Sequence, residues 1–414
     1  MSISPETKSW IPVHPESHFP IQNLPFGMAC REDESETIVM RIGDLALDLG
    51  LLLEAGMLSD QEFPSLERLT DLDLASIRQL RNRVGDLLRS DNRTLRDNSE
   101  LREEVLVPVD DLDLMVPMDI PAFVDFYSGI NHASNVGKMF RPDMPPLLPN
   151  YRHLPVGYNG RASSVIPSGV PVRRPSGQTK AADSEAPRFG PTEELDFELE
   201  LGFFIAEGND LGEPISIHKT DDHILGMVLV NDWSARDVQR WEYQPLGPFL
   251  AKSFATSVSP WIVTLDALQP FLIAGETQDP EVLSHLKSRK PGHYNLHLEV
   301  AIQTAAMTKP QVVSRTNSRH LYWTIAQQLA HQTSNGTNTE AGDLYASGTI
   351  SGTEPGTFGS LLELTWRGRD KLTMEETGEE RTFLEDGDTV IFTGYGQAED
   401  YRIGFGELSA TVFG

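Results

Sequence analysis

The pattern of hydrophobic and polar positions divides the chain into two units, residues 1–118 and residues 119–414. In the first unit, residues 37–42 and 45–49 have the β-branched and apolar content of strands, and a Gly-Asp turn separates them. Residues 64–89 carry leucine, isoleucine and valine at largely helical spacing, which predicts a helix. The first unit is therefore expected to combine short strands with one long helix.

Residues 119–414 contain many short apolar runs that glycine and proline separate. The expected strands are 195–205, 224–230, 261–265, 294–304, 361–366 and 389–393. Helical spacing is rare in this unit, and residues 321–331 are its clearest case. Many strands without regular intervening helices favour a mainly antiparallel β domain over a doubly wound one. The segment 157–191 is rich in Gly, Pro and Ser, and its tyrosine and arginines favour a loop that lines a site.

The composition is that of a globular protein with a strong excess of acid. The 414 residues include 34 Lys and Arg against 61 Asp and Glu, a net charge of −27, which argues against a nucleic-acid partner. Anionic small substrates stay possible, because a few buried Arg and Lys can dominate one site. With Cys30 as the one cysteine, no intrachain disulfide can form. Residues 1–20 lack the apolar run of a secretory signal, and no run reaches the about 20 residues that cross a bilayer, so we expect a cytoplasmic protein without a membrane partner.

Carboxylates are the first candidates for chemistry. Glu198 and Glu200 are two residues apart on an expected strand, so they share one face. A solvated acidic strand is the alternative interpretation of that pair. Asp125 and Asp232 lie in apolar, glycine-rich or aromatic surroundings, and four carboxylates gathered without a cation would raise one another's pKa. A divalent cation would resolve the repulsion, and oxygen ligands favour Mg²⁺ or Ca²⁺ over Zn²⁺.

Proton carriers and fixed cations are the second group of candidates. His132 follows Asp125 by seven residues in a polar segment, which makes it the candidate base, with a structural histidine as the alternative. The residues themselves do not show which acid would orient it. Lys252 lies among apolar residues, which favours a buried, paired or catalytic lysine. Arg236 and Gln239 are donors that could stabilise an oxyanion, or polar surface residues after a strand.

Eight segments carry a resemblance that runs nearly end to end. These are 19–25, 125–141, 154–164, 196–200, 231–239, 246–254, 347–352 and 358–366. On them the chain resembles the fumarylacetoacetate hydrolase family. The resemblance implies a mainly β (α+β) fold, with a small SH3-like N-terminal β-barrel in residues 1–118. It also implies a C-terminal mixed β-sandwich or β-roll hydrolase domain in residues 119–414, and a homodimer.

The same resemblance implies roles for individual residues. The implied metal residues, for Ca²⁺ or Mg²⁺ and a second cation near 252–256, are Asp125, Glu198, Glu200, Asp232, Lys252 and Thr256. The implied catalytic residues are His132 to activate water, Glu363 to orient it, and Arg236, Gln239 and Lys252 for the oxyanion. The implied substrate contacts are Tyr127, Arg141, Tyr158, Gln239, Tyr243 and Thr349.

The implied reaction is the metal-dependent hydrolysis of a carbon–carbon bond in 4-fumarylacetoacetate to give fumarate and acetoacetate, the last step of tyrosine and phenylalanine breakdown. Two alternatives stay open at this point. One is a related enzyme that acts on another β-diketo acid, or as a decarboxylase or isomerase, and the other is a calcium-dependent binding protein. Ala255 stands where the family has glycine, which makes the second cation the least secure expectation. Residues 308–339 diverge, and no role is assigned to them.

Overall fold

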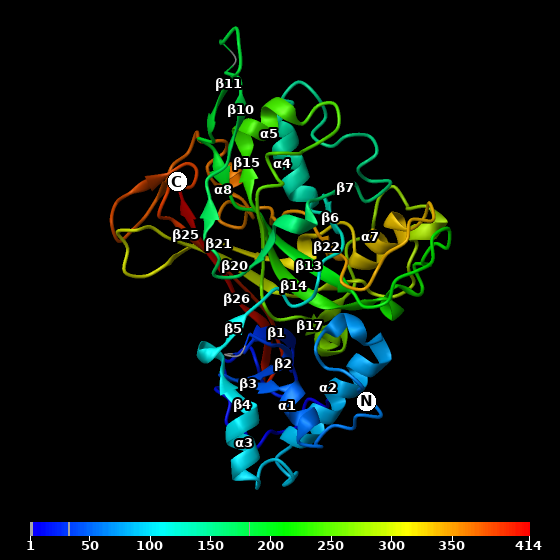
Figure 1. Cartoon of the computed structure of the whole chain (residues 1–414). Helices are drawn as coiled ribbons and strands as arrows, with labels where there is room; N and C mark the ends of the chain where they lie inside the picture. Colours follow the sequence, from blue (N-terminus) through cyan, green and yellow to red (C-terminus); the bar gives the residue numbers. More distant parts are fainter. Residues whose placement is uncertain (1–2, 32–33, 182) are drawn as a thin grey trace.

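The computed structural model describes residues 3–31, 34–181 and 183–414 (Figure 1). Ala182, within the expected 157–191 loop, lies outside the described residues. The N-terminal part forms an antiparallel sheet in the order β4-β3-β2-β1-β5. Its strands are β1 (Phe26–Cys30), β2 (Glu36–Ile42), β3 (Leu45–Asp48), β4 (Leu106–Pro108) and β5 (Asp113–Leu114). Its helices are α1 (Leu49–Glu54), α2 (Leu74–Leu88) and α3 (Ser99–Val105).

Local sequence explains the elements predicted in this part. The turn between β2 and β3 contains Gly43, whose φ of +57° favours glycine, and both predicted strands are confirmed. Helix α2 starts after Asp73, whose carboxylate accepts a hydrogen bond from the Ser76 amide at 2.7 Å. The helix predicted within 64–89 is confirmed, but it begins only at Leu74.

Two larger sheets of the C-terminal part pack face to face. One has the order β7-β6-β22-β13-β14-β16-β8, with β17 paired to β14, and the other has the order β21-β20-β25-β26-β9. The first sheet, here called the large sheet, consists of β6 (Phe123–Phe126), β7 (Gly157–Asn159), β8 (Val165–Pro167), β13 (Leu199–Ile205), β14 (Ile224–Asp232), β16 (Thr256–Val258), β17 (Val263–Thr264) and β22 (Leu344–Ala346). The second sheet consists of β9 (Val172–Arg173), β20 (His297–Gln303), β21 (Gln311–Asn317), β25 (Thr389–Gln397) and β26 (Arg402–Phe413).

Shorter elements complete the C-terminal part. Its paired short strands are β10 (Ser176–Thr179) with β11 (Arg188–Pro191), β12 (Leu195–Asp196) with β15 (Ser234–Ala235), β18 (Leu272–Ile273) with β19 (His293–Tyr294), and β23 (Leu372–Thr373) with β24 (Glu380–Arg381). Its helices are α4 (Ile130–Phe140), α5 (Arg236–Glu242), α6 (Leu265–Leu268), α7 (Ile325–Gln332) and α8 (Leu361–Leu364). The mainly β (α+β) class is confirmed, with a small N-terminal sheet ahead of a larger sandwich of sheets.

The large sheet is covered on both faces. Along β14, Met227 and Leu229 belong to the hydrophobic cluster shared with the second sheet. Val228 and Val230 point the other way and belong to the cluster shared with the N-terminal part. All residues of β14 are buried as a result, including Asp232 at its end. Asp232 is therefore a charged side chain in a buried position.

One predicted strand, residues 361–366, is wrong, because the chain forms helix α8 there. The Ser360 hydroxyl accepts a hydrogen bond from the Glu363 amide at the start of this helix. The Asp196 carboxylate accepts two more, from the amides of Leu361 at 2.7 Å and Leu362 at 3.0 Å. Side chains thus satisfy the first amides of a short helix that hydrophobic periodicity alone does not reveal.

The remaining predictions are confirmed with adjusted limits. The strands expected at 224–230, 294–304 and 389–393 are β14, β20 and β25, and the helix expected at 321–331 is α7. The expected strand 195–205 is interrupted between β12 and β13, and 261–265 keeps only the short β17 before α6 begins. The expected loop 157–191 includes β7 to β11, and β10 with β11 forms a hairpin that projects from the body (Figure 1).

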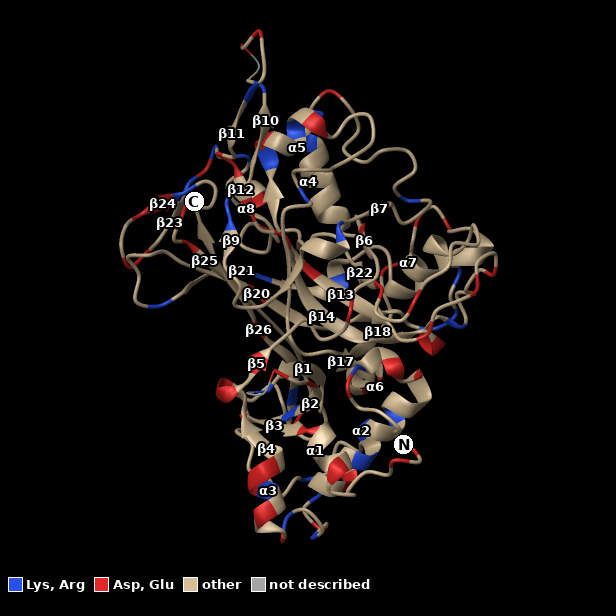
Figure 2. Cartoon of the chain, viewed as in Figure 1, with Lys and Arg blue, Asp and Glu red and all other residues tan. Residues whose placement is uncertain are grey.

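Charged side chains are spread over many elements. Figure 2 shows acidic residues on loops and helices in both parts of the chain, α3 among them, rather than gathered on one face. This distribution agrees with a solvated acidic surface. None of the helices in the described part of the chain has the length and apolar character that crossing a bilayer requires.

Asp343, immediately before β22, should make stability depend on pH. Its side chain is buried, one carboxylate oxygen accepts from the Glu340 amide, and the other lacks a hydrogen-bond partner within residues 3–31, 34–181 and 183–414. Burial raises the pKa of Asp343 from its ordinary 3.8 to about 6. A raised pKa favours the folded state at low pH, and this contribution is lost as pH rises through about 6.

Between pH 4 and pH 7, we therefore expect the unfolding free energy of wild type to fall by about 2 kcal/mol relative to that of Asp343→Asn. Urea unfolding across this range measures the difference, with the exposed Asp210→Asn as the control. Parallel pH curves for wild type and Asp343→Asn would contradict the expectation.

Candidate active site

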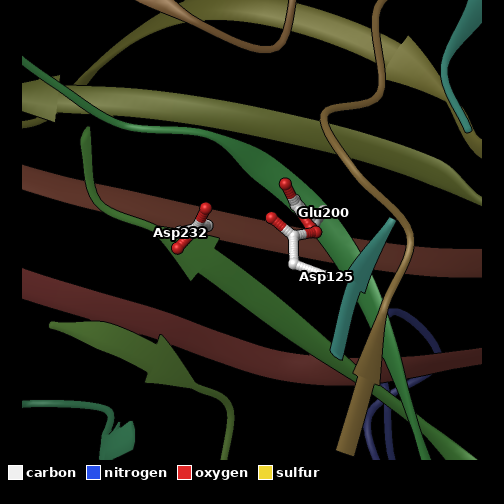
Figure 3. A group of neighbouring side chains, drawn as sticks. All are labelled: Asp125, Glu200 and Asp232. Carbon is white, nitrogen blue, oxygen red and sulfur yellow. The ribbon is translucent and has the colours of Figure 1, made fainter. Parts of the chain in front are cut away.

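Three carboxylates meet at the ends of strands in the large sheet. Asp125 on β6, Glu200 on β13 and Asp232 on β14 each place one oxygen within 4.8 Å of the others. Figure 3 shows these carboxylates turned toward one another. The convergence follows from strand register. Glu200 on β13 pairs with Val230 on β14, so their side chains lie on the same face of the sheet. Asp232 comes two residues after Val230, so its side chain lies on that face too.

The oxygen atoms of this cluster fit a divalent cation. Oδ1 of Asp125 and Oε1 of Glu200 are buried, and no residue in the described part of the chain donates a hydrogen bond to them. Burial raises the pKa of both carboxyls well above their ordinary values, and the negative charge of Asp232 adds to this shift. An all-oxygen donor set with unsatisfied buried lone pairs is suited to Mg²⁺ or Ca²⁺, which would remove both penalties. The residues present therefore fit the predicted metal.

Glu198 lies among positive charges rather than within this cluster. Its carboxylate is 2.7 Å from Nζ of Lys252 and also pairs with Arg236. Burial raises the pKa of Glu198, but Arg236 and Lys252 outweigh burial and hold that pKa well below its ordinary value. Lys252 is also 2.5 Å from Oδ2 of Asp232, so it joins the two groups of acids. The predicted role of Glu198 as a metal ligand stays a prediction.

The second predicted cation region adjoins the same acids. The Thr256 hydroxyl donates to Oδ1 of Asp232 at 3.3 Å. Ala255 precedes it without a positive φ angle, so the alanine carries no left-handed strain. The departure from glycine at this position therefore has no backbone cost of the expected kind.

A histidine and a glutamate form a buried pair beside the acids. Nδ1 of His132, on α4, is 2.6 Å from Oε2 of Glu363, on α8. Glu363 also accepts from Asn135 at 2.9 Å, Ser351 at 2.7 Å and Ser360 at 3.0 Å. Burial raises the pKa of Glu363, but its interaction with His132 and the hydrogen bonds from Asn135 and Ser351 hold that pKa below its ordinary value. A charged Glu363 keeps the proton on Nδ1, which leaves Nε2 of His132 to accept a proton.

Most of the predicted residues line one cavity of about 420 Å³. Those that line it are Asp125, Tyr127, His132, Arg141, Tyr158, Glu198, Arg236, Gln239, Tyr243 and Lys252. Those in the buried layer around it are Glu200, Asp232, Thr256, Thr349 and Glu363. The structure thus brings together residues that are as far apart in sequence as Asp125 and Glu363.

Several donors in and around this cavity have no partner among the described residues. These are Nε of Arg141, Nη2 of Arg236 and the hydroxyl of Thr349, all of them buried. The Tyr158 hydroxyl donates to Asp232 at 3.2 Å, and the ring of Tyr127 meets His132 edge-on at 5.5 Å. Unused buried donors indicate that a ligand with several oxygen atoms completes the site.

Sequence reasoning missed the residues that hold the predicted ones in place. Asp196 pairs with Arg236 at 2.8 Å and also binds the start of α8, so one acid fixes two elements of the site. The amide of Gly348 donates to Glu200 at 3.0 Å. Asn135 lies three residues after His132, which places both on one helix face, and that spacing is a signal the sequence does contain. Ser351 carries no such signal, because only the fold brings it to Glu363.

Buried carboxylates suited to a divalent cation, beside a His–Glu pair and two fixed cations, are the equipment of a metal-dependent hydrolytic enzyme. Comparison with known sequences identifies the family within this class of enzymes. Residues 22–117 match the family described as fumarylacetoacetase N-terminal, and residues 122–413 match that described as fumarylacetoacetate (FAA) hydrolase C-terminal. The chain belongs to the fumarylacetoacetate hydrolase family.

Curated relatives share the whole length of the chain. It is 47% identical to the fumarylacetoacetase of Homo sapiens and 46% identical to that of Rattus norvegicus, each over 412 residues and 98% of both chains. The fumarylacetoacetase of Arabidopsis thaliana is 44% identical over 414 residues, again 98% of both chains.

Solved structures share the fold at much lower identity. A fumarylacetoacetate hydrolase (EaFAH) from psychrophilic Exiguobacterium antarcticum has a TM-score of 0.51 at 16% identity, covering 94% of this chain and 99% of that one. A putative HpcE protein from Mycobacterium smegmatis has a TM-score of 0.53 at 18% identity, covering 93% and 98%. At these identities the similarity shows a common fold alone.

Lys252→Met should destabilise the protein strongly in the presence of a chelator. The substitution removes the ammonium group that Glu198 and Asp232 share as an ion-pair partner, while both carboxylates stay buried. Breaking a buried ion pair in this way costs about 3–5 kcal/mol. Lys371→Met is the control, since Lys371 pairs with Glu380 at the surface, where such a pair contributes about 1 kcal/mol or less. Urea unfolding measures both, and equal losses would contradict the buried network.

Proposed function

We propose that this protein hydrolyses the carbon–carbon bond of 4-fumarylacetoacetate to fumarate and acetoacetate, the last step of tyrosine and phenylalanine catabolism. The observation that carries the proposal is the cavity in which His132, held by Glu363, lies beside cation-suited carboxylates and buried Arg and Lys side chains. Full-length similarity to curated fumarylacetoacetases supports the same reaction.

The cation would be held by Asp125, Glu200 and Asp232, with Glu198 beside them. When bound, a divalent cation supplies Lewis acidity toward a 1,3-dicarbonyl group. Nε2 of His132 takes a proton from water, and the hydroxide formed attacks the neighbouring carbonyl carbon. Glu363 stabilises the resulting imidazolium through Nδ1.

Negative charge then develops on the attacked carbonyl oxygen. Nη2 of Arg236, for which the described residues offer no acceptor, and the ammonium of Lys252 would stabilise it. Gln239 accepts from Arg236 through Oε1, and its amide nitrogen would donate to the substrate. When the carbon–carbon bond breaks, His132 returns its proton to the departing carbon. Arg141 would bind a substrate carboxylate through donors that include its unpartnered Nε.

The same proposal covers the remaining substrate contacts, the metal, the location, the domain boundary and the oligomeric state. Tyr127, Tyr158, Tyr243 and Thr349 would hold substrate oxygens, and a second cation would lie near residues 252–256. We propose Ca²⁺ or Mg²⁺ as the metal, a cytoplasmic location, and domains that divide between residues 118 and 119. A homodimer is supported by exposed apolar side chains near the cavity, namely Trp241, Leu246, Phe249 and Leu250.

The decisive experiment follows the ultraviolet absorbance of fumarylacetoacetate with Mg²⁺, with Ca²⁺ and after chelation. Rapid cation-dependent loss that yields fumarate and acetoacetate is the expected result. His132→Ala should lower kcat about 10²–10⁴-fold while calorimetry shows unchanged cation binding, and His297→Ala, on β20, should match wild type. Folded wild-type protein that consumes no fumarylacetoacetate under any condition would overturn the proposal in favour of another β-diketo acid.

A further inference from the structure

The two oxygens of the Glu363 carboxylate have very different surroundings. Oε2 accepts three hydrogen bonds, from Nδ1 of His132, the Ser351 hydroxyl and the Ser360 hydroxyl. Among the described residues, the hydrogen bond to Oε1 comes from Nδ2 of Asn135 at 2.9 Å. The Glu363 side chain is fully buried, so its oxygens have no contact with bulk water. One oxygen is therefore saturated, and the other depends on Asn135.

Asn135 shares helix α4 with His132. Residues three apart on a helix lie on one face, so α4 presents an imidazole and an amide side by side to the two oxygens of one carboxylate. The plane of the carboxylate is thereby fixed relative to the helix that carries the base. The three hydrogen bonds to Oε2 hold one oxygen of Glu363, and the bond from Asn135 holds the other.

We propose that Asn135 is a positioning residue for the catalytic base, which acts by holding Oε1 of Glu363 so that Oε2 stays in line with Nδ1 of His132. The inference rests on the proposed function for its kinetic consequence, but not for its geometry. Without Asn135, Oε1 is a buried carboxylate oxygen without a partner, and the group turns to share the donors of Oε2. The imidazole follows its partner, and a shift of Nε2 by about 1 Å can cost about 10²-fold in rate.

The test compares two asparagines on the same helix. Asn135→Leu removes the hydrogen bond to Glu363. Asn131→Leu removes a hydrogen bond of 3.0 Å from α4 to the backbone oxygen of Ser351, which ties the helix to the same region without touching Glu363. Asn135→Ser, whose shorter side chain does not reach Oε1, is the second variant if the leucine variant does not fold.

The kinetic expectation is a fall in kcat of about 10–100-fold for Asn135→Leu, with KM near the wild-type value, because substrate contacts stay in place. Asn131→Leu should keep the wild-type kcat per folded molecule whatever it does to the melting temperature. If both variants lose stability and neither loses kcat, Asn135 is structural and the proposal is overturned.

A spectroscopic readout separates this inference from the proposed reaction. In protein labelled with ¹⁵N-histidine, the Nδ1 proton of His132 should give a downfield resonance that His132→Ala removes. This resonance should shift in Asn135→Leu and stay unchanged in Asn131→Leu. A resonance that Asn135→Leu leaves unchanged overturns the positioning role. A shifted resonance in a protein that does not hydrolyse fumarylacetoacetate overturns the reaction and supports the positioning role.

Discussion

The balance of buried charge at the ends of β13 and β14 is the constraint on which the site depends. The large sheet is covered on both faces, so the acids on its strands are buried. Lys252 and Arg236 neutralise part of the charge through Glu198. Asp125 and Glu200 each keep one oxygen that no described residue contacts by a hydrogen bond, and a divalent cation would satisfy both. The fold thus leaves excess negative charge beside the His–Glu pair, and a bound cation would neutralise it.

Local pattern was sufficient for most of the fold. Strand β14 is almost entirely apolar, as expected of a strand that is buried on both faces. Buried and partly exposed residues alternate along β25, as expected of a strand that is buried on one face. The pattern failed at residues 361–366, because Asp196 caps that helix from 165 positions away. The projecting hairpin of β10 and β11 was also missed, since its polar, Gly- and Pro-rich sequence is equally typical of a loop.

Some residues of the candidate site could be selected from the sequence alone, and others could not. His132 and the acids could be selected by their surroundings in the sequence, but the residues alone could not select Glu363 as the acid that orients the base. The resemblance supplied that pairing, and the 2.6 Å distance between the two side chains supports it. Asn135 was accessible from helical spacing, whereas Ser351 was not, because tertiary packing alone brings it to the carboxylate.

The melting temperature of Glu200→Gln, with Mg²⁺ and with chelator, shows whether a cation relieves the repulsion among the buried acids. The chelated variant should melt above the chelated wild type, because the substitution removes a buried like charge and keeps an acceptor for the Gly348 amide. Mg²⁺ should raise the melting temperature of wild type but not of the variant. A chelated variant that melts below wild type and still responds fully to Mg²⁺ would show that the buried acids neither repel one another nor hold the cation through Glu200.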